Sequence, residues 1–159
     1  MATITRIEDI DAWQSARELS EAFQVVSAGF ARVDLKDQMQ RAADSGMANI
    51  AEGFEAGYDP EFIRFLKIAK RSETEFQSHL HVARAAKQIT TVEFDALYEI
   101  ARRTKAQIGG FIHYLESCVK AKSKRERLQH KRKSRASRRR PRTARPETAD
   151  RPLTEDRRP

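Results

Sequence analysis

The 159-residue chain contains a single cysteine, Cys118, so it can form neither an intrachain disulfide nor a zinc site with several thiolate ligands. Glycine and proline are scarce, at 6 and 5 residues, which argues against an all-β or loop-rich protein. No apolar run approaches the roughly 18 residues of a membrane-spanning helix. The opening residues are acidic and lack the apolar stretch of a secretory signal. We therefore expect a soluble, helical, cytoplasmic protein that does not contact a membrane.

The chain also lacks the residue patterns of common catalytic and metal sites. His79 and His81 are two positions apart, so they point to different faces of a helix and cannot share a metal. Cys118 and His113 are about 140° apart on a helix, with no third group to orient them. No glycine-rich phosphate loop ends in Gly-Lys-Ser or Gly-Lys-Thr. We expect no enzyme activity, no metal, no cofactor and no small-molecule substrate.

Three polar residues near apolar positions leave two interpretations open. Asn49, Glu52 and Glu75 could supply the paired groups that acid–base catalysis needs. Arg41 and Arg64 could instead pair with the two carboxylates as purely structural partners. We favour structural pairing.

The positive charge is concentrated at one end of the chain. Residues 1–118 carry a net charge of −4, and residues 119–159 carry +12. The second segment has few large apolar side chains and cannot bury a core. We predict a folded domain over residues 1–118 and a basic, largely disordered tail over 119–159. Residues 123–159 are expected to be disordered in isolation, and the prolines from Pro141 onward stop any helix near Arg140.

Apolar residues recur at steps of three and four in four segments, as expected for helices with one buried face. The four stripes are Ala12, Ala16, Leu19, Phe23, Val26 and Phe30; Leu35, Met39, Ala42, Ala43, Met47, Ile50 and Phe54; Phe62, Leu66, Ala69, Phe76, Leu80 and Ala83; and Phe94, Leu97, Ala101, Thr104, Ile108, Phe111 and Leu115. The segments are joined by short connections. This pattern predicts an all-α fold, an antiparallel up-and-down four-helix bundle with a disordered basic C-terminal tail.

Local signals mark where two of these helices begin. Asp59 is expected to cap the third helix, with Pro60 in its first turn. Thr90 and Glu93 form a capping box at the start of the fourth. Gly109 and Gly110 lie inside the fourth helix, where either flexibility or close packing explains them, and we favour close packing. Small residues make the second helix thin enough for a neighbour to approach closely.

Three segments resemble a known family. The opening resembles it through Trp13, Gln14, Ala16, Arg17, Glu18 and Leu19. The second segment carries Leu35, Gln38, Arg41, Ala42, Ala43, Ser45, Ala48, Asn49, Ile50, Ala51, Glu52 and Gly53. The third carries Phe62, Phe65, Leu66, Ala69, Ser72, Glu75 and Leu80. Together these motifs resemble the 23S rRNA intervening-sequence proteins over residues 7–117.

The resemblance implies a helical bundle that assembles with copies of itself, as a barrel-shaped homopentamer. Relatives of that shape include the accessory proteins of diversity-generating retroelements, which bind nucleic acid and a reverse transcriptase. The family has no catalytic residues to transfer to this chain. The sequence departs from the pattern of the resembled family at Gly46 and Met47 in the second segment and at Glu73 in the third.

The basic tail indicates binding to a polyanion, with RNA as the natural candidate and DNA as the other. Lysine and arginine both contact phosphate, and the planar guanidinium does so with two hydrogen bonds. No aromatic residue follows Tyr114, so base stacking cannot contribute and binding should tolerate any sequence. The candidate nucleic-acid-binding residues are Lys120, Lys122, Lys124, Arg125, Arg127, Lys131, Arg132, Lys133, Arg135, Arg138, Arg139, Arg140 and Arg142.

The composition of the tail also fits three simpler roles. The tail could serve only for solubility, contact an anionic membrane, or be an extension without a role. Two function classes follow for the whole chain. The first is a non-enzymatic, oligomeric accessory protein that binds nucleic acid. The second is a protein–protein interaction scaffold that recruits a partner through its assembled face, with the tail incidental.

Overall fold

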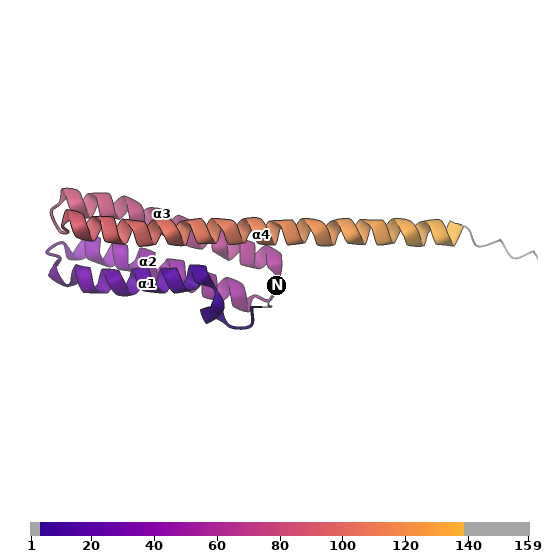
Figure 1. Ribbon diagram of the computed structural model, residues 1–159, viewed down its shortest axis with the longest axis horizontal. Helices are drawn as coiled ribbons and strands as arrows, with labels where there is room; N and C mark the ends of the chain where they lie inside the picture. The colour runs from indigo at the N-terminus through magenta and orange to yellow at the C-terminus, as the bar shows by residue number, and fades with distance from the viewer. Residues whose placement is uncertain (1–3, 139–159) are drawn as a thin grey trace, which may run out of the picture. The chain divides into compact units, whose positions relative to one another are not determined.

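The computed structural model describes residues 4–138, with side chains described up to Ser134. It contains four α-helices, α1 (Asp11–Val26), α2 (Val33–Glu55), α3 (Asp59–Ala85) and α4 (Thr91–Arg138), and two short 3-10 turns, Ile7–Asp9 and Ser27–Gly29. Consecutive helices run in opposite directions and are joined at alternating ends of the bundle (Figure 1). The residues described include no strand. The predicted all-α, antiparallel four-helix bundle is confirmed.

The chain divides into two compact units, Met1–Ser123 and Lys124–Pro159, and the bundle occupies the first. No helix in the described part of the chain is long and apolar enough to cross a membrane.

The start of α4 follows the predicted capping box. The backbone N–H of Thr90 donates to Glu93 Oε2 at 2.7 Å, and the N–H of Glu93 donates to Thr90 Oγ1 at 3.2 Å. These bonds satisfy two of the amide groups that a helix start leaves unpaired. The hydrogen bonds from Thr90 also lower the pKa of Glu93.

The predicted cap of α3 is wrong. Asp59 is the first residue of α3 and Tyr58 precedes it, with no side-chain hydrogen bond to the helix start. Pro60 lies in the first turn, where its missing N–H costs nothing. Asp59 Oδ2 instead accepts a hydrogen bond from Lys122 Nζ at 2.5 Å, so the carboxylate is held toward α4 rather than over the helix end.

The apolar stripes meet in two buried clusters. Most of the predicted stripe residues are buried, whereas Val26, Met47, Phe54 and Phe111 are half-buried and pack at the edges of the clusters. The first cluster contains Leu19, Phe23, Phe30, Leu35, Met39, Ala42, Ala43, Phe76, Leu80, Ala83, Ile89, Phe94, Leu97 and Ala101. The second contains Ile10, Ala12, Ala16, Ile50, Phe62, Ile63, Leu66, Ala69, Ile108 and Leu115.

A polar layer separates the two clusters along the helices. It consists of Gly46 on α2, Ser72 and Glu73 on α3, and Thr104 on α4, all of them buried. Both hydroxyl groups of the layer form hydrogen bonds within their own helices. Ser72 donates to the backbone carbonyl of Ile68, and Thr104 donates to that of Ile100. The layer therefore interrupts the core without leaving these hydroxyls unpaired.

Glu73 is the exception in the polar layer. Its side chain is 0% exposed, and neither carboxyl oxygen has a hydrogen-bond partner among the residues described. The carboxyl group lies against the backbone of Gly46, where a Cβ would overlap Glu73 Oε1. Gly46 and Glu73 thus complement each other: the absence of a side chain at Gly46 on α2 leaves the space that the Glu73 side chain on α3 fills.

Burial of Glu73 raises its pKa to about 8, and the positive charge of Lys105 opposes that rise only in part. The cause is the loss of water around a carboxylate that has no hydrogen-bond donor to replace it. At neutral pH the buried side chain is therefore mainly the neutral acid.

We predict that the bundle loses stability as the pH rises from about 4.5, the ordinary pKa, to about 8, the pKa in the folded state. Over that range the unfolded chain releases the Glu73 proton and the folded chain holds it, so deprotonation favours unfolding. Glu73→Gln should remove this dependence and stabilise the protein most above pH 8. Urea unfolding at pH 5 and pH 8.5 measures it, and equal effects of Glu73→Gln at both pH values would contradict the burial of an unpaired carboxyl.

The close packing expected at Gly109 and Gly110 is not observed against any of the residues that the structure describes. A Cβ at Gly110 would meet no atom within 4 Å, and one at Gly109 would meet only the flexible end of Lys70 at 3.5 Å. Close packing occurs on α2 instead. A Cβ at Gly53 would lie 2.5 Å from the ring of Phe62 and 2.8 Å from the Cβ of Phe65.

Alanine substitutions should separate these two kinds of glycine. Gly110→Ala should stabilise the protein by about 1 kcal/mol, because alanine favours the helix and meets no neighbour. Gly53→Ala should destabilise it by about 1–3 kcal/mol through overpacking against α3. Chemical denaturation measures both changes. A destabilising Gly110→Ala would instead place another surface, such as a second copy of the chain, against this face of α4.

The expected disorder of residues 123–159 does not hold for residues 123–134, where α4 continues as helix, and the helix backbone runs on to Arg138. The fourth helix is nucleated inside the bundle, so each later residue needs only to propagate it. Lysine, arginine, glutamine, leucine and alanine all propagate a helix well, and no proline occurs between Pro60 and Pro141. The rest of the predicted disordered segment, residues 139–159, lies outside the described residues.

Candidate nucleic-acid interface

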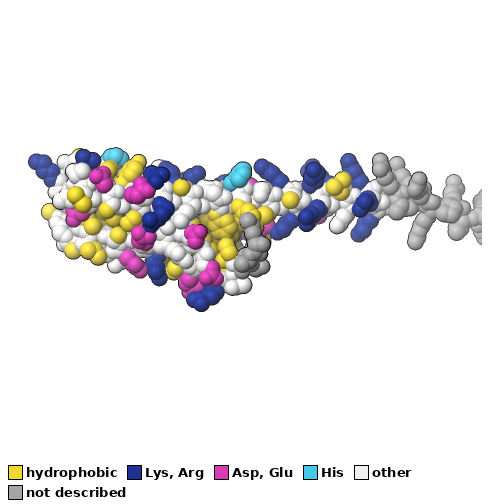
Figure 2. Space-filling view, in the orientation of Figure 1, with side chains coloured by type: hydrophobic (Ala, Val, Ile, Leu, Met, Phe, Trp, Pro, Cys, Tyr) yellow, Lys and Arg dark blue, Asp and Glu magenta, His cyan; other side chains and the backbone are white. Residues whose placement is uncertain are grey.

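The second unit begins in α4, and every side chain from 124 to 134 is exposed. Figure 2 shows Lys and Arg side chains along this segment, whereas acidic and basic side chains are mixed over the bundle. The predicted binding residues exposed here are Lys124, Arg125, Arg127, Lys131, Arg132 and Lys133. We refer to residues 124–138 of α4 as the basic helix.

The remaining predicted residues fall on either side of this group. Lys120 and Lys122 belong to the first unit, and both are exposed. Arg135 and Arg138 are positions of the basic helix whose side chains are not described. The other three, Arg139, Arg140 and Arg142, lie outside the described residues.

Lys122 already has an anionic partner, unlike the predicted binding residues whose side chains are described between 124 and 134. Its Nζ lies 2.5 Å from Asp59 Oδ2, and this hydrogen bond raises the pKa of Lys122. Among the side chains described from 124 to 134, no lysine or arginine forms an ion pair. These cations therefore retain their water and can exchange it for phosphate.

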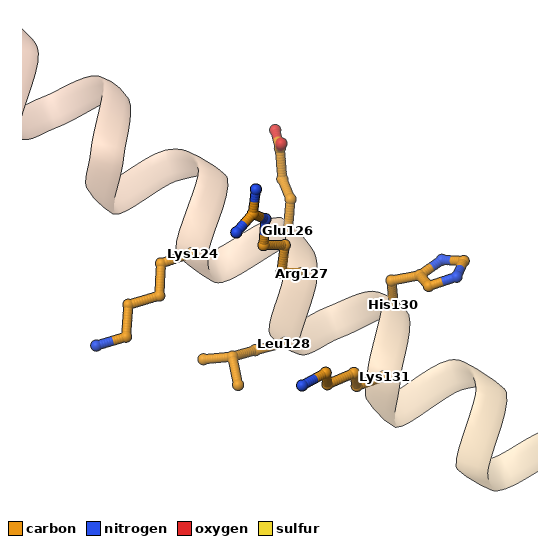
Figure 3. A pocket seen from close by; sticks show the side chains of 6 residues that line it. All are labelled: Lys124, Glu126, Arg127, Leu128, His130 and Lys131. Atoms are coloured by element: carbon orange, nitrogen blue, oxygen red, sulfur yellow. The ribbon is translucent and has the colours of Figure 1, made fainter.

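The side chains of the basic helix differ from one side to the other (Figure 3). Lys124, Leu128 and Lys131 point to one side, as their spacing of four and three residues requires, and Glu126 and His130 point away from it. A shallow surface pocket is lined by Lys124, Glu126, Arg127, Leu128, His130 and Lys131. Leu128 is the only large apolar side chain in it.

Most of the bundle matches a known family of proteins. A family model described as the 23S rRNA-intervening sequence protein matches residues 8–110, which is more than half of the chain. The chain belongs to the 23S rRNA-intervening sequence protein family. The basic helix lies outside the residues that the family model matches.

One solved structure with a similar fold is a protein of unknown function from the S23 ribosomal protein family of Bacteroides thetaiotaomicron. It is 18% identical, with a TM-score of 0.60, and the match covers 64% of this chain and 95% of that chain. At this identity the likeness shows the fold alone. No curated protein matches the chain.

In this member of the intervening-sequence family, the two histidines considered as metal ligands, His79 and His81, each contact a different neighbour. His79 lies 3.8 Å from Glu75, and the ring of His81 packs edge-on against Phe94 at 5.0 Å between centroids. In the part of the chain that the structure describes, no three histidine, cysteine or acidic residues are grouped as metal ligands.

Cys118 is half-buried and interacts with Tyr114, one helical turn earlier, rather than with His113. Hydrogen bonding to Cys118 raises the pKa of the Tyr114 hydroxyl.

The ion pairs expected between Arg41 or Arg64 and Glu52 or Glu75 do not occur among the described residues, although the charge of Glu52 contributes to raising the pKa of Arg64. Arg64 pairs with Glu61 at 2.6 Å rather than with either of them. Asn49 donates to the carbonyl of Ser45 at 2.7 Å, which is a local helix contact. Glu52 and Glu75 are both exposed, one on α2 and the other on α3, so they form no carboxylate pair in a buried site.

Residues 124–138 are expected to be helical in solution. Gln129→Pro should remove one amide donor and clash with the preceding turn, so the helix should break near residue 125. Gln129→Ala is the matched control, because it keeps both the charge and the helix. Far-ultraviolet circular dichroism should show a loss of helical signal only for Gln129→Pro, with the thermal unfolding of the bundle unchanged. Equal spectra for the two variants would mean that the segment is not helical.

Proposed function

We propose that this protein is a non-enzymatic, nucleic-acid-binding accessory protein that acts in the cytoplasm and contacts its ligand through the basic helix and the arginine-rich residues that follow it. The observation that carries the proposal is the run of exposed lysine and arginine side chains without ion pairs from Lys124 to Lys133. Both RNA, the candidate that the sequence favours, and DNA present the phosphates that these groups bind.

The charge distribution supports nucleic acid over a membrane as the partner. A helix that binds a bilayer surface needs an apolar face to bury in it. Among the described side chains of the basic helix, Leu128 is the only large apolar one. The affinity must therefore come from charge, which tolerates any sequence and falls steeply with salt.

Self-assembly adds to this proposal. The resemblance to homopentameric relatives supports an oligomer of this chain, in which several basic helices act on the same ligand. Linked sites raise the effective concentration of each further contact, so an assembly binds more tightly than one chain. Residues of the bundle hold the assembly, and the basic helices hold the nucleic acid.

A protein–protein scaffold is the second candidate, and one observation favours it. Val25 and Val33 flank the α1–α2 connection, and Val82 and Val92 flank the α3–α4 connection. All four are exposed, from 43% at Val82 to 78% at Val25 and Val92. Both connections lie at the same end of the bundle (Figure 1), so this end could recruit a protein partner while the basic helix stays incidental.

A full-length variant with Lys124, Arg127 and Lys131 changed to Gln tests the proposed function. The matched control changes Arg41, Lys70 and Arg71, three exposed cations of the bundle, to Gln. In filter binding, the first variant should lose most of its affinity for RNA and DNA, and the control should bind like the native chain. If six to ten phosphates are contacted, native affinity should fall by roughly 10³ to 10⁵ between 50 and 200 mM salt.

Equal losses in the two triple variants would show that net charge matters and the basic helix does not. A protein partner captured equally by the native chain and the basic-helix variant, after nuclease treatment, would favour the scaffold.

A further inference from the structure

The cations of the basic helix cover more of its circumference than one contact face requires. Successive residues turn by about 100°, so Lys124, Arg127 and Lys131 share one side. Arg125 and Arg132, seven residues apart, share a second side. Each of these side chains is exposed.

Lys133 extends the charge to a third side, next to the position of Glu126. The cations therefore span about two thirds of the circumference, and the remaining third carries Glu126 and His130. Figure 3 shows these two side chains pointing away from Lys124 and Lys131.

This distribution indicates a concave partner. A flat surface contacts at most half of a cylinder, so it would leave either Lys133 or the side with Lys131 in water. A groove with two charged walls contacts both sides, and the remaining third of the helix faces out. Nucleic-acid duplexes supply such grooves, because each wall is a row of phosphates.

The width of the groove distinguishes between duplexes. An α-helix with its side chains is about 10–12 Å across. The major groove of B-form DNA is about 12 Å wide and 8.5 Å deep and admits a helix. The major groove of A-form RNA is too narrow and deep for side chains to reach into it.

We propose that the basic helix binds B-form duplex DNA by lying in the major groove, with Glu126 and His130 facing the solvent. This inference rests on the proposed function, and it narrows the proposed ligand from nucleic acid in general to duplex DNA. The expectation of RNA assumes a tail without structure, which would follow any phosphate backbone. A helix has a fixed diameter and so favours the groove that accommodates it.

Fluorescence anisotropy with the full-length protein tests the ligand class. The probes are a labelled 20-base-pair DNA duplex of mixed sequence, an RNA duplex of the same sequence, and single-stranded RNA. We expect the DNA duplex to bind at least about tenfold more tightly than either RNA at the same salt. Gln129→Pro should abolish this preference, and Gln129→Ala should keep it.

Three single substitutions test the position of the helix in the groove. Lys131→Ala and Lys133→Ala lie on opposite flanks, and each should reduce DNA affinity severalfold and lower the salt slope by about 0.9. His130→Ala, on the outward side, should change neither quantity. The three alanines leave the helix intact.

Equal binding of the three probes, or tighter binding of the RNA duplex, overturns the groove proposal and leaves the proposed function standing. A loss confined to Lys131→Ala also overturns it, because that result describes contact on one side only. If the native protein binds none of the probes, the proposed function fails, and this inference fails with it.

Discussion

The burial of one apolar stripe on α4 determines the conformation of residues on both sides of Ser123. Leu97, Ala101 and Ile108 fix the first part of the helix against the bundle, and that contact supplies the costly nucleation step. The described side chains from 124 to 134 are all exposed, yet these residues continue the helix because each adds a hydrogen bond to a turn that already exists. The arrangement of cations on the basic helix therefore depends on hydrophobic packing in the bundle.

The polar layer is the second constraint on this fold. Gly46, Glu73 and Thr104 lie along α2, α3 and α4 between the residues of the two apolar clusters. A neutral carboxyl group thus occupies the middle of the bundle at a cost in stability. The contact between Gly46 and Glu73 gives a physical reason for the residue at each of these two positions, which neither position explains alone.

Much of the fold could be predicted because its signals are local. Steps of three and four identify the helices, and Thr90 with Glu93 marks the start of α4. Sequence reasoning misses the buried carboxyl, although its signal is visible: Glu73 occupies the stripe position between Ala69 and Phe76. It also misses the helix beyond Ser123, because a segment without a core is unstructured only when it stands alone and not when it continues a helix. The candidate interface residues follow from composition; their arrangement around a helix does not.

The contact between Gly46 and Glu73 has a consequence for how this sequence can change over time. Any side chain at position 46 would overlap the carboxyl group, and any shorter residue at position 73 would leave an empty space beside the glycine. A substitution at position 46 alone would therefore have to displace the carboxyl end of Glu73, while a paired exchange that moves the bulk from α3 to α2 preserves the filled volume. The two positions are expected to covary, and a lineage that exchanged both would also lose the ionisable group from its interior.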